Sequence, residues 1–447
     1  MSEESSYKFG DFCFNIKKRR LLCGDEVVAL PPKAIEALEI FLKNPGRIIE
    51  KRELMTALWS DVVVSESNLT QTIYLLRRAT SGADGHLIEN ISKRGYRFTG
   101  EVRKSENGQA EGLNGKSSFS EHEDAYEEYL KAKNFRLLHT AEGFEKAFFH
   151  ARRAVEINPD FAPAHIEIAA CYELLRLYGA MPAAEAVPQI KAALATALRL
   201  DENAAEALVI LGSIKTFHDW EFDEAETALK KAVELKPDNV EAFTVYNELL
   251  IALERFEEAE EILRRALELD PLSLILPVSL ARLYYYWRKF DEALACLQPV
   301  IEKDPNFSPA LLTFGNIYEA QNESFRATTA LLKVAERNDI ARQWALVGLG
   351  RIYAMTGLKT EALKVLDELL RLSEANHISP YTVAALYEAL DEQDRVFEWL
   401  RKAFDERTNQ LIHLKVDPHF DKVRDDVRFD ELLKKLRLLP DDSEKKD

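Results

Sequence analysis

The stretch SNLTQTIYLLRRA (residues 67–79) reads as a short amphipathic helix with a polar, partly basic outer face. It is either a packing helix of a small domain or a helix that enters a groove of DNA. At 100° per residue, Leu69, Thr72, Ile73 and Leu76 share one face, which predicts packing against neighbouring helices. The opposite face consists of Asn68, Gln71, Tyr74, Leu75 and Arg78. The residues before and after this helix decide between the two alternatives.

The surrounding sequence predicts a small domain that mixes strands and helices. Strand-like segments come first, in YKFGDFCFNI, RRLLCG and EVVAL (within residues 7–30). Proline and glycine then bracket a helix in PPKAIEALEIFLKNPG (31–46), and KRELMTALW (51–59) is a second helix. HLIENISKRGYRFTGEV (86–102) reads as two strands joined by a basic turn. Three helices followed by a basic hairpin make a winged helix-turn-helix, so the head (residues 1–104) is expected to have an α+β fold.

This order of elements resembles the DNA-binding effector domain of the OmpR/PhoB type, and the head is similar to CadC/ToxR-type heads without their membrane anchor. The residues that carry the resemblance are RELMTALW (52–59), LTQTIYLLRRA (69–79) and KRGYRF (93–98). It covers nearly all of residues 7–103. The resemblance implies that the third helix (about 67–79) lies in the major groove and that the 92–97 hairpin is the wing.

Candidate DNA-binding residues follow from side-chain chemistry and from the resemblance. Asparagine and glutamine can pair bidentately with adenine, and arginines can neutralise phosphates. The resemblance adds phosphate contacts from the second helix and the tip of the wing. The expected set is Arg52, Trp59, Asn68, Gln71, Tyr74, Arg77, Arg78, Lys93 and Arg94. Leu75 occupies a position that is often basic in this family, which moves base reading toward Asn68 and Gln71 and leaves a thymine-methyl contact by Leu75 as an alternative.

Composition and charge narrow the class of protein. Residues 1–104 hold 17 Lys and Arg against 14 Asp and Glu, a net charge of +3, whereas the remaining residues hold 42 against 62, a net charge of −20. The sequence has no run of about 20 apolar residues, the length that a membrane-spanning helix needs. The N-terminus does not resemble a signal peptide. Four cysteines without a CxxC pair predict reduced thiols. The histidines lack metal-binding spacing, so we expect a cytoplasmic protein with no metal or other cofactor.

A long body follows a polar segment (105–122) with the composition of a flexible linker. In the body, ELKP, ELDP and EKDP end at Pro237, Pro271 and Pro305, spaced 34 residues apart. This period resembles the tetratricopeptide repeat (TPR), a pair of helices. The resemblance implies an all-α right-handed solenoid over 123–439, with seven repeats, a degenerate eighth and a C-terminal cap. Residues 440–447 are expected to be a disordered charged tail.

Small residues mark the predicted close crossing of the two helices of each repeat. They are Ala147, Ala225, Ala259, Ala293, Ala327 and Ala362. In register, Arg282, Asn316 and Arg351 fall at equivalent positions of the first helices, which line the concave face of such a solenoid. This stripe could clamp a carboxylate or an acidic peptide. The alternative is that these side chains pair with Glu and Asp of their own solenoid.

The leading hypothesis is a cytoplasmic transcription regulator resembling soluble one-component regulators. Its expected partners are double-stranded DNA for the head and a protein or peptide on the concave face of the repeats. RNA polymerase contact and a homodimer on DNA are further expectations, and no membrane contact is expected. The alternative is an interaction scaffold whose winged helix binds protein. An enzyme is not expected, because no nucleophile–base pair, catalytic carboxylate motif or cofactor loop is recognisable.

Overall fold

The computed structural model divides the chain into two compact units, Met1–Ser120 and Glu121–Asp447. They are called the head and the body below, and each is treated by itself. The structure describes residues 6–16, 19–24, 26–28, 30, 32–58, 69, 72–73, 76–77, 79–80, 87–91, 94–105, 118–136, 141–177, 181–337, 341–373 and 378–440. Most of the predicted third helix, and the predicted tail from 441 onward, lie outside these residues.

The head begins with an antiparallel five-stranded sheet in the order β4-β3-β2-β1-β8. Its strands are β1 (Ser6–Phe9), β2 (Phe12–Asn15), β3 (Arg20–Cys23), β4 (Glu26–Val28) and β8 (Arg103–Ser105). The segment YKFGDFCFNI forms two of these strands, because the chain turns at Gly10, where φ is +50°. Phe9, Phe12 and Phe14 are buried and contribute one face of the sheet to the core. Strand β8 crosses the predicted domain end at residue 104.

The rest of the head has the predicted helices and hairpin. Helix α1 (Pro32–Lys43) starts at a proline and is followed by Gly46, whose φ is +73°, as the bracketing predicted. Helix α2 (Lys51–Leu58) comes next. A second sheet, in the order β5-β7-β6, joins β5 (Ile48–Glu50) to the hairpin of β6 (Ile88–Ile91) and β7 (Gly95–Phe98). Strand β5 was not predicted.

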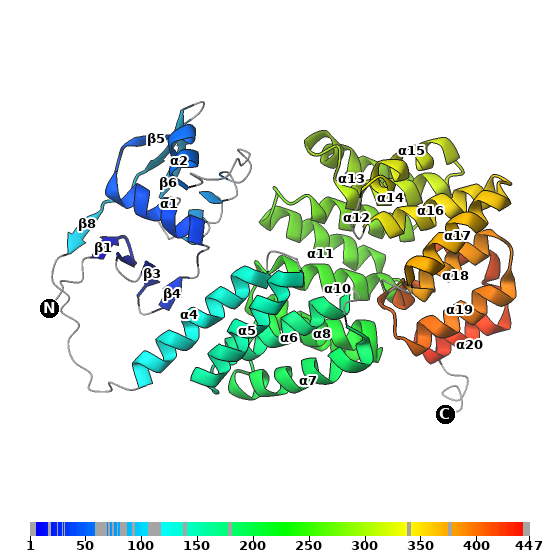
Figure 1. Ribbon diagram of the computed structural model, residues 1–447, viewed down its shortest axis with the longest axis horizontal. Coiled ribbons are helices and arrows are strands. Elements are labelled where there is room, and N and C mark those ends of the chain that lie inside the picture. Colours follow the sequence, from blue (N-terminus) through cyan, green and yellow to red (C-terminus); the bar gives the residue numbers. More distant parts are fainter. Residues whose placement is uncertain are drawn as a thin grey trace. The chain divides into compact units, whose positions relative to one another are not determined.

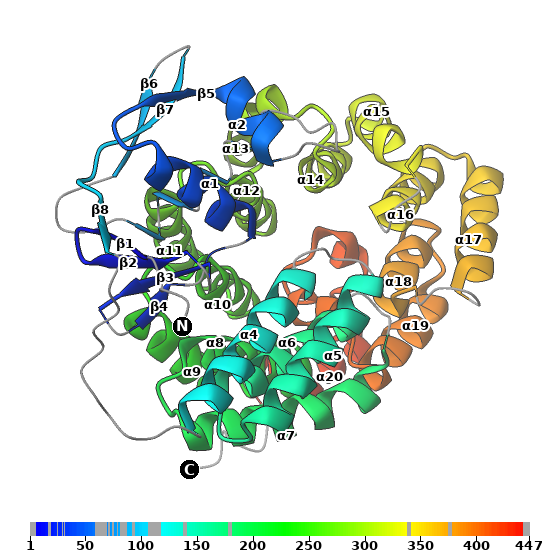
Figure 2. The ribbon, with the colours of Figure 1, turned by 60° about the vertical axis from the view of Figure 1, so that its left-hand side comes forward.

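The described part of the body contains eight helix pairs that follow the predicted repeat (Figures 1 and 2). The pairs are α4 (Ser118–Arg136) with α5 (Ala141–Ile157), α6 (Ala162–Leu177) with α7 (Ala183–Leu200), α8 (Ala205–Ile214) with α9 (Phe222–Leu235), α10 (Val240–Ala252) with α11 (Phe256–Leu269), α12 (Ile275–Tyr286) with α13 (Phe290–Lys303), α14 (Ser308–Ala320) with α15 (Ser324–Ala335), α16 (Ala341–Met355) with α17 (Lys359–Ser373), and α18 (Pro380–Ala389) with α19 (Gln393–Asp405). A π-helical turn, η1 (Lys215–Asp219), follows α8. Helix α4 begins inside the segment predicted as a linker. The residues that follow this segment, EDAYEEYLKA, are rich in the helix formers Glu and Ala, and the helix extends back from them.

Close packing within each pair depends on small side chains. The six alanines predicted at the helix crossings are all fully buried. Gly315 of α14 also allows its helix to pack closely on α15, because a Cβ atom there would lie 2.5 Å from Cδ2 of Leu331. The turn after each of several first helices contains a residue in the left-handed conformation, and these residues are also one repeat apart. They are Trp220, Glu254, Arg288, Asn322, Gly357 and Asp391.

The chain then leaves the repeat pattern and returns across the first helices. Two short 3-10 helices, η2 (Asn409–His413) and η3 (Pro418–Val423), precede the last helix, α20 (Val427–Lys435). Residues 409–423, the C-terminal segment, lie beside α10 and η1 at one end and α18 at the other (Figure 1). Arg407, two residues before the segment, donates a hydrogen bond of 2.5 Å to the carbonyl of His218. The predicted C-terminal cap therefore covers part of the concave face.

Candidate functional site

The described residues of the predicted third helix confirm its inward face. Leu69, Ile73 and Leu76 are at most 1% exposed, and Thr72 is also buried. The three apolar side chains belong to the same core cluster as Leu38 of α1 and other buried residues of the head. Because this face is fixed against the core, the sequence positions on the opposite side of the helix are the ones that remain for a partner.

Arg77 connects the third helix to the hairpin. Its Nε donates a hydrogen bond of 2.8 Å to the carbonyl of Ile88, and its guanidinium lies 5.8 Å from the ring centroid of Tyr96. Such contacts hold β6 and β7 against the helix. The sequence pointed to a phosphate contact for this residue and gave no sign of this internal role. Thr80 ends the described part of the helix with a hydrogen bond from its hydroxyl to the carbonyl of Leu76.

The hairpin presents a basic tip on a fixed base. Arg94 is exposed, and its backbone N–H donates to the carbonyl of Ile91 at 2.9 Å. Gly95 has φ +155°, and a Cβ atom there would lie 2.0 Å from the carbonyl oxygen of Ile49, so only glycine fits where β7 meets β5. Arg52 is exposed near the start of α2. The other predicted DNA-binding residues, Trp59, Asn68, Gln71, Tyr74, Arg78 and Lys93, lie outside the described residues.

The predicted stripe on the body contains two arginines that are paired within the solenoid. Arg351 is 6% exposed at its side chain, and its guanidinium lies 2.7 Å from Glu319 and 3.0 Å from Glu388. It also donates to the carbonyl of Ala385. Burial by itself lowers the pKa of Arg351, but the two carboxylates raise it above its ordinary value. Arg351 therefore links α14, α16 and α18, as the alternative interpretation of the stripe expected, and is not available to clamp a partner.

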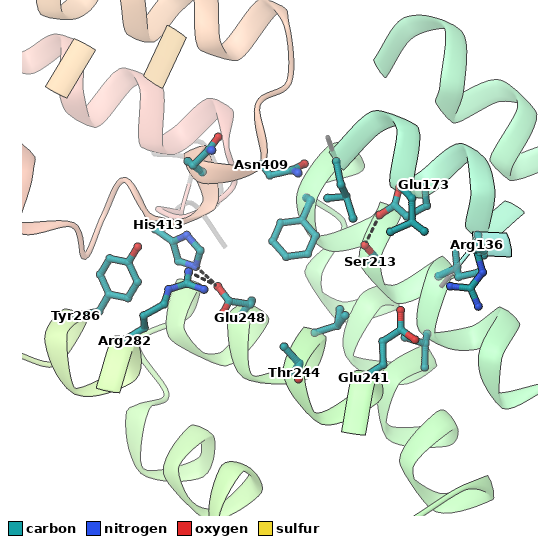
Figure 3. Close-up of a pocket in the computed structure, with 18 residues that line it drawn as sticks. Arg136, Glu173, Ser213, Glu241, Thr244, Glu248, Arg282, Tyr286, Asn409 and His413 are labelled. Carbon is teal, nitrogen blue, oxygen red and sulfur yellow. Dashed lines mark hydrogen bonds and ion pairs between the residues drawn. The ribbon is translucent and has the colours of Figure 1, made fainter. Parts of the chain in front are cut away.

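Arg282 is paired more loosely. Its Nη2 lies 3.2 Å from Oε2 of Glu248, while 40% of its side chain stays exposed. His413 of the C-terminal segment approaches the same carboxylate oxygen, with Nε2 at 2.9 Å. Figure 3 shows the His413 ring and the Arg282 side chain both pointing toward the Glu248 carboxylate. Burial raises the pKa of Glu248, but Arg282 and His413 lower it to about 2, so the carboxylate is ionised at neutral pH.

Two cavities open on the concave side of the body, and the C-terminal segment lines both of them. The first, drawn in Figure 3, has a volume of about 370 Å³ and extends from Arg136 to Arg282. Glu173 and Glu241 also line it, and Glu173 accepts a hydrogen bond of 2.6 Å from Ser213. The second has a volume of about 490 Å³ and lies among α12, α14, α16, α18 and the segment. Both cavities share Arg282, Tyr286 and Gln410.

The described residues provide neither a metal-binding cluster nor a membrane-spanning helix. Within the ranges given above, no three His, Cys, Asp or Glu side chains come together in a way that could hold a metal ion. None of the helices seen in those ranges is long and apolar enough to span a membrane.

Comparisons with known proteins agree with this division of the chain. Residues 24–98 match the family model described as "Transcriptional regulatory protein, C terminal", and residues 221–276 match a tetratricopeptide repeat model. The transcriptional regulator HilA of Salmonella typhi is 39% identical over 93 residues, which are 21% of this chain and 17% of HilA. The phosphate regulon transcriptional regulatory protein PhoB of Shigella flexneri is 25% identical over 101 residues, 22% of this chain and 44% of PhoB.

The body also has a structural counterpart. A monomeric mutant of IFIT1, solved with Gppp-AAAA, aligns over 71% of this chain and 72% of that chain with a TM-score of 0.51. At 16% sequence identity this likeness shows the fold alone.

The two family matches and the two related regulators define the class of each unit. The head is an OmpR/PhoB-type winged helix-turn-helix, the class found in DNA-binding transcriptional regulators, and the body is a TPR solenoid. The match to HilA spans about a sixth of that regulator's length.

Proposed function

We propose that this protein is a DNA-binding transcriptional regulator whose third helix (about 67–79) lies in the major groove, with the 92–97 hairpin as the wing. The observation that carries this proposal is the family match over residues 24–98. The burial of Leu69, Ile73 and Leu76 supports it, because it turns the opposite face of the helix outward. The exposure of Arg94 at the hairpin tip supports a wing that reaches the phosphate backbone.

Within this proposal the side chains divide into two roles. Asn68 and Gln71 read base edges, because their amides can pair bidentately with adenine. Phosphate contacts position the head, and they come from Arg52, Trp59, Tyr74, Arg78, Lys93 and Arg94. Arg77 stays in the proposed phosphate-binding set, and its Nε also donates to the carbonyl of Ile88. The small positive charge of the head predicts modest intrinsic affinity, which favours a homodimer or adjacent half-sites on DNA.

The body has the regulatory role in this proposal. TPR solenoids present a concave surface for partners, and here that surface contains two cavities. The strongly acidic body is repelled by phosphate, so it is expected to stay off the DNA and to bind a protein partner or a ligand. RNA polymerase is a candidate protein partner, and the cytoplasm is the proposed compartment.

The test selects bound duplexes from fragmented genomic DNA with the full chain and with residues 1–120, the compact unit that has its own core. We expect specific sites with both. Gln71→Ala should change preference at one base pair by about 1–3 kcal/mol. Arg94→Ala should weaken all sequences about equally and reduce the slope of log affinity against log salt by about 1.

Arg97→Ala is the matched control, because Arg97 lies on the same hairpin but is paired with Glu89 at 2.6 Å. It should affect DNA binding less than Arg94→Ala. If neither form of the protein enriches any sequence at low salt, the regulator proposal fails. The alternative would then be a scaffold whose winged helix binds protein, and partners of both units should be sought.

A further inference from the structure

Part of the concave face of the body is already occupied by the protein's own C-terminal segment. Arg176 of α6 donates a hydrogen bond to Asn409, and Arg288 at the end of α12 pairs with Asp421 at 2.8 Å. Lys415 pairs with Glu254 in the same stretch. An extended peptide along the first helices would have to displace these contacts. The two cavities described above border this segment.

The second cavity has the size and lining of a small-molecule site. Its volume of about 490 Å³ falls within the range of about 300–1,000 Å³ that is usual for such sites. Apolar and aromatic side chains from three successive first helices line it. They include Ile275, Val278, Leu312, Trp344 and Val347. An apolar lining that includes the planar ring of Trp344 suits a compact ligand with an aromatic or otherwise planar body.

Two polar groups in this cavity can receive a ligand. Arg282 contacts Glu248 and the hydroxyl of Tyr286, and 40% of its side chain stays exposed. Asn316 follows it by 34 residues on the next first helix and lines the same cavity. Across the described part of the chain, the structure gives no hydrogen bond for the Asn316 side chain. Thr313 nearby is different, because its hydroxyl donates to the carbonyl of Pro309 at 2.8 Å.

The charges around the cavity favour an anionic ligand group over a cationic one. Its acid Asp417 is already bound by the hydroxyl of Tyr381 at 2.7 Å and by Nδ1 of His419 at 3.1 Å. Glu319 and Glu388 nearby are paired with Arg351. A ligand amine would therefore compete with existing partners at Asp417, the acid that lines this cavity. Glu319, whose Oε2 is buried without a hydrogen-bond partner, and Glu388 do not line it. A ligand carboxylate would meet Arg282, which lines the cavity with a partly exposed side chain.

We propose that this second cavity binds a compact monocarboxylate with a planar apolar body. Its carboxylate accepts hydrogen bonds from Arg282 and Asn316, and its body packs against Trp344, Leu312 and Val347. The first cavity does not suit such a ligand, because its lining includes three glutamates, Glu173, Glu241 and Glu248. This inference rests on the proposed function in one respect, because the proposed function gives the body the role of binding the regulatory ligand.

The test titrates the full chain with 2-naphthoate by isothermal calorimetry and compares its neutral isostere, 2-naphthamide. We expect saturable one-to-one binding of the acid. The amide should bind about ten- to hundredfold more weakly, the change expected when a charge-assisted hydrogen bond is lost. Arg282→Met should reduce the affinity for the acid to that for the amide. Asn316→Leu, which leaves every ion pair of the body intact, should also weaken the acid more than the amide.

Two more variants control for indirect effects. Val347→Phe should abolish binding of both probes by filling the cavity. Arg288→Met also removes an arginine of the same region and its ion pair with the C-terminal segment, but its side chain does not line this cavity, so affinity should persist. The proposal is overturned if the acid shows no saturable heat up to about 1 mM, if acid and amide bind equally, or if Arg288→Met weakens binding as much as Arg282→Met.

The same preparation is assayed for specific DNA binding, which keeps the two proposals separate. Specific DNA binding without carboxylate binding refutes the cavity assignment alone. Carboxylate binding without any DNA binding refutes the regulator proposal and leaves the cavity assignment standing.

Discussion

Replacing Arg351 by methionine would leave Glu319 and Glu388 buried without their shared cation. The side chains of all three residues are at most 6% exposed, and the two ion-pair distances are 2.7 and 3.0 Å. Removing one member of a buried ion pair costs about 3–5 kcal/mol, mostly because an uncompensated charge stays behind. Here two carboxylates lose their partner, so we expect Arg351→Met to destabilise the body by at least that amount.

The assay is urea unfolding followed by circular dichroism, with Arg342→Met as the matched control. Arg342 lies on the same helix and pairs with Glu368 at 2.7 Å, but both side chains are at least one third exposed. Exposed pairs contribute about 0–1 kcal/mol, so this variant should unfold close to the unaltered protein. Adding Glu319→Gln and Glu388→Gln to Arg351→Met should recover much of the loss. Equal unfolding midpoints for Arg351→Met and Arg342→Met would refute the reasoning.

Two further predictions concern the C-terminal segment and the helix crossings. Burial by itself lowers the pKa of His419, but the neighbouring carboxylates raise it above its ordinary value. The groups that face its ring are Asp417, Tyr285, Glu319 and Arg351. A raised pKa stabilises the fold fully below the unfolded value of about 6.5, and this contribution is lost as pH rises through the folded value. Hydrogen exchange of the segment should therefore speed up, beyond the intrinsic rate, as pH rises above about 6.5. His419→Gln should remove this change and His165→Gln should not. Separately, Gly315→Ala should destabilise by about 1–3 kcal/mol despite its better helix propensity, because the new methyl group meets buried Leu331. Gly350→Ala, with nearest contacts of 3.1 Å, should cost less in the same thermal unfolding assay, and a stabilised Gly315→Ala would contradict the packing argument.

Local patterns explain why much of the fold could be predicted from the sequence. The repeat period and the crossing alanines are set within one helix pair, and every predicted crossing alanine is fully buried. The inward face of residues 67–79 follows from helical periodicity and was confirmed at Leu69, Ile73 and Leu76. Strands β5 and β8, each three residues long, escaped prediction because such short strands owe their existence to pairing with distant partners.

The candidate sites were less predictable because they depend on contacts between distant residues. Register alone placed Arg282, Asn316 and Arg351 in one stripe. Whether each arginine is already paired within the solenoid depends on carboxylates of neighbouring repeats. Glu319 and Glu388, the partners of Arg351, are 32 and 37 residues away. The hydrogen bond from Arg77 to Ile88 joins the third helix to the hairpin and has no signature in either segment. Nothing in the sequence of residues 409–423 indicates that they return to α10.

The return of the C-terminal segment has a consequence for the order in which the body is completed. Arg176 and Asn409, joined by a hydrogen bond, are 233 residues apart, whereas contacts of an ordinary solenoid connect neighbouring repeats. During synthesis the first repeats can form while the segment is still untranslated. The concave face is then open to solvent and to other molecules until the ribosome has passed residue 423. Closing so long a loop is the slow, non-local step of folding, and nascent chains should expose this surface longer than any other part of the body.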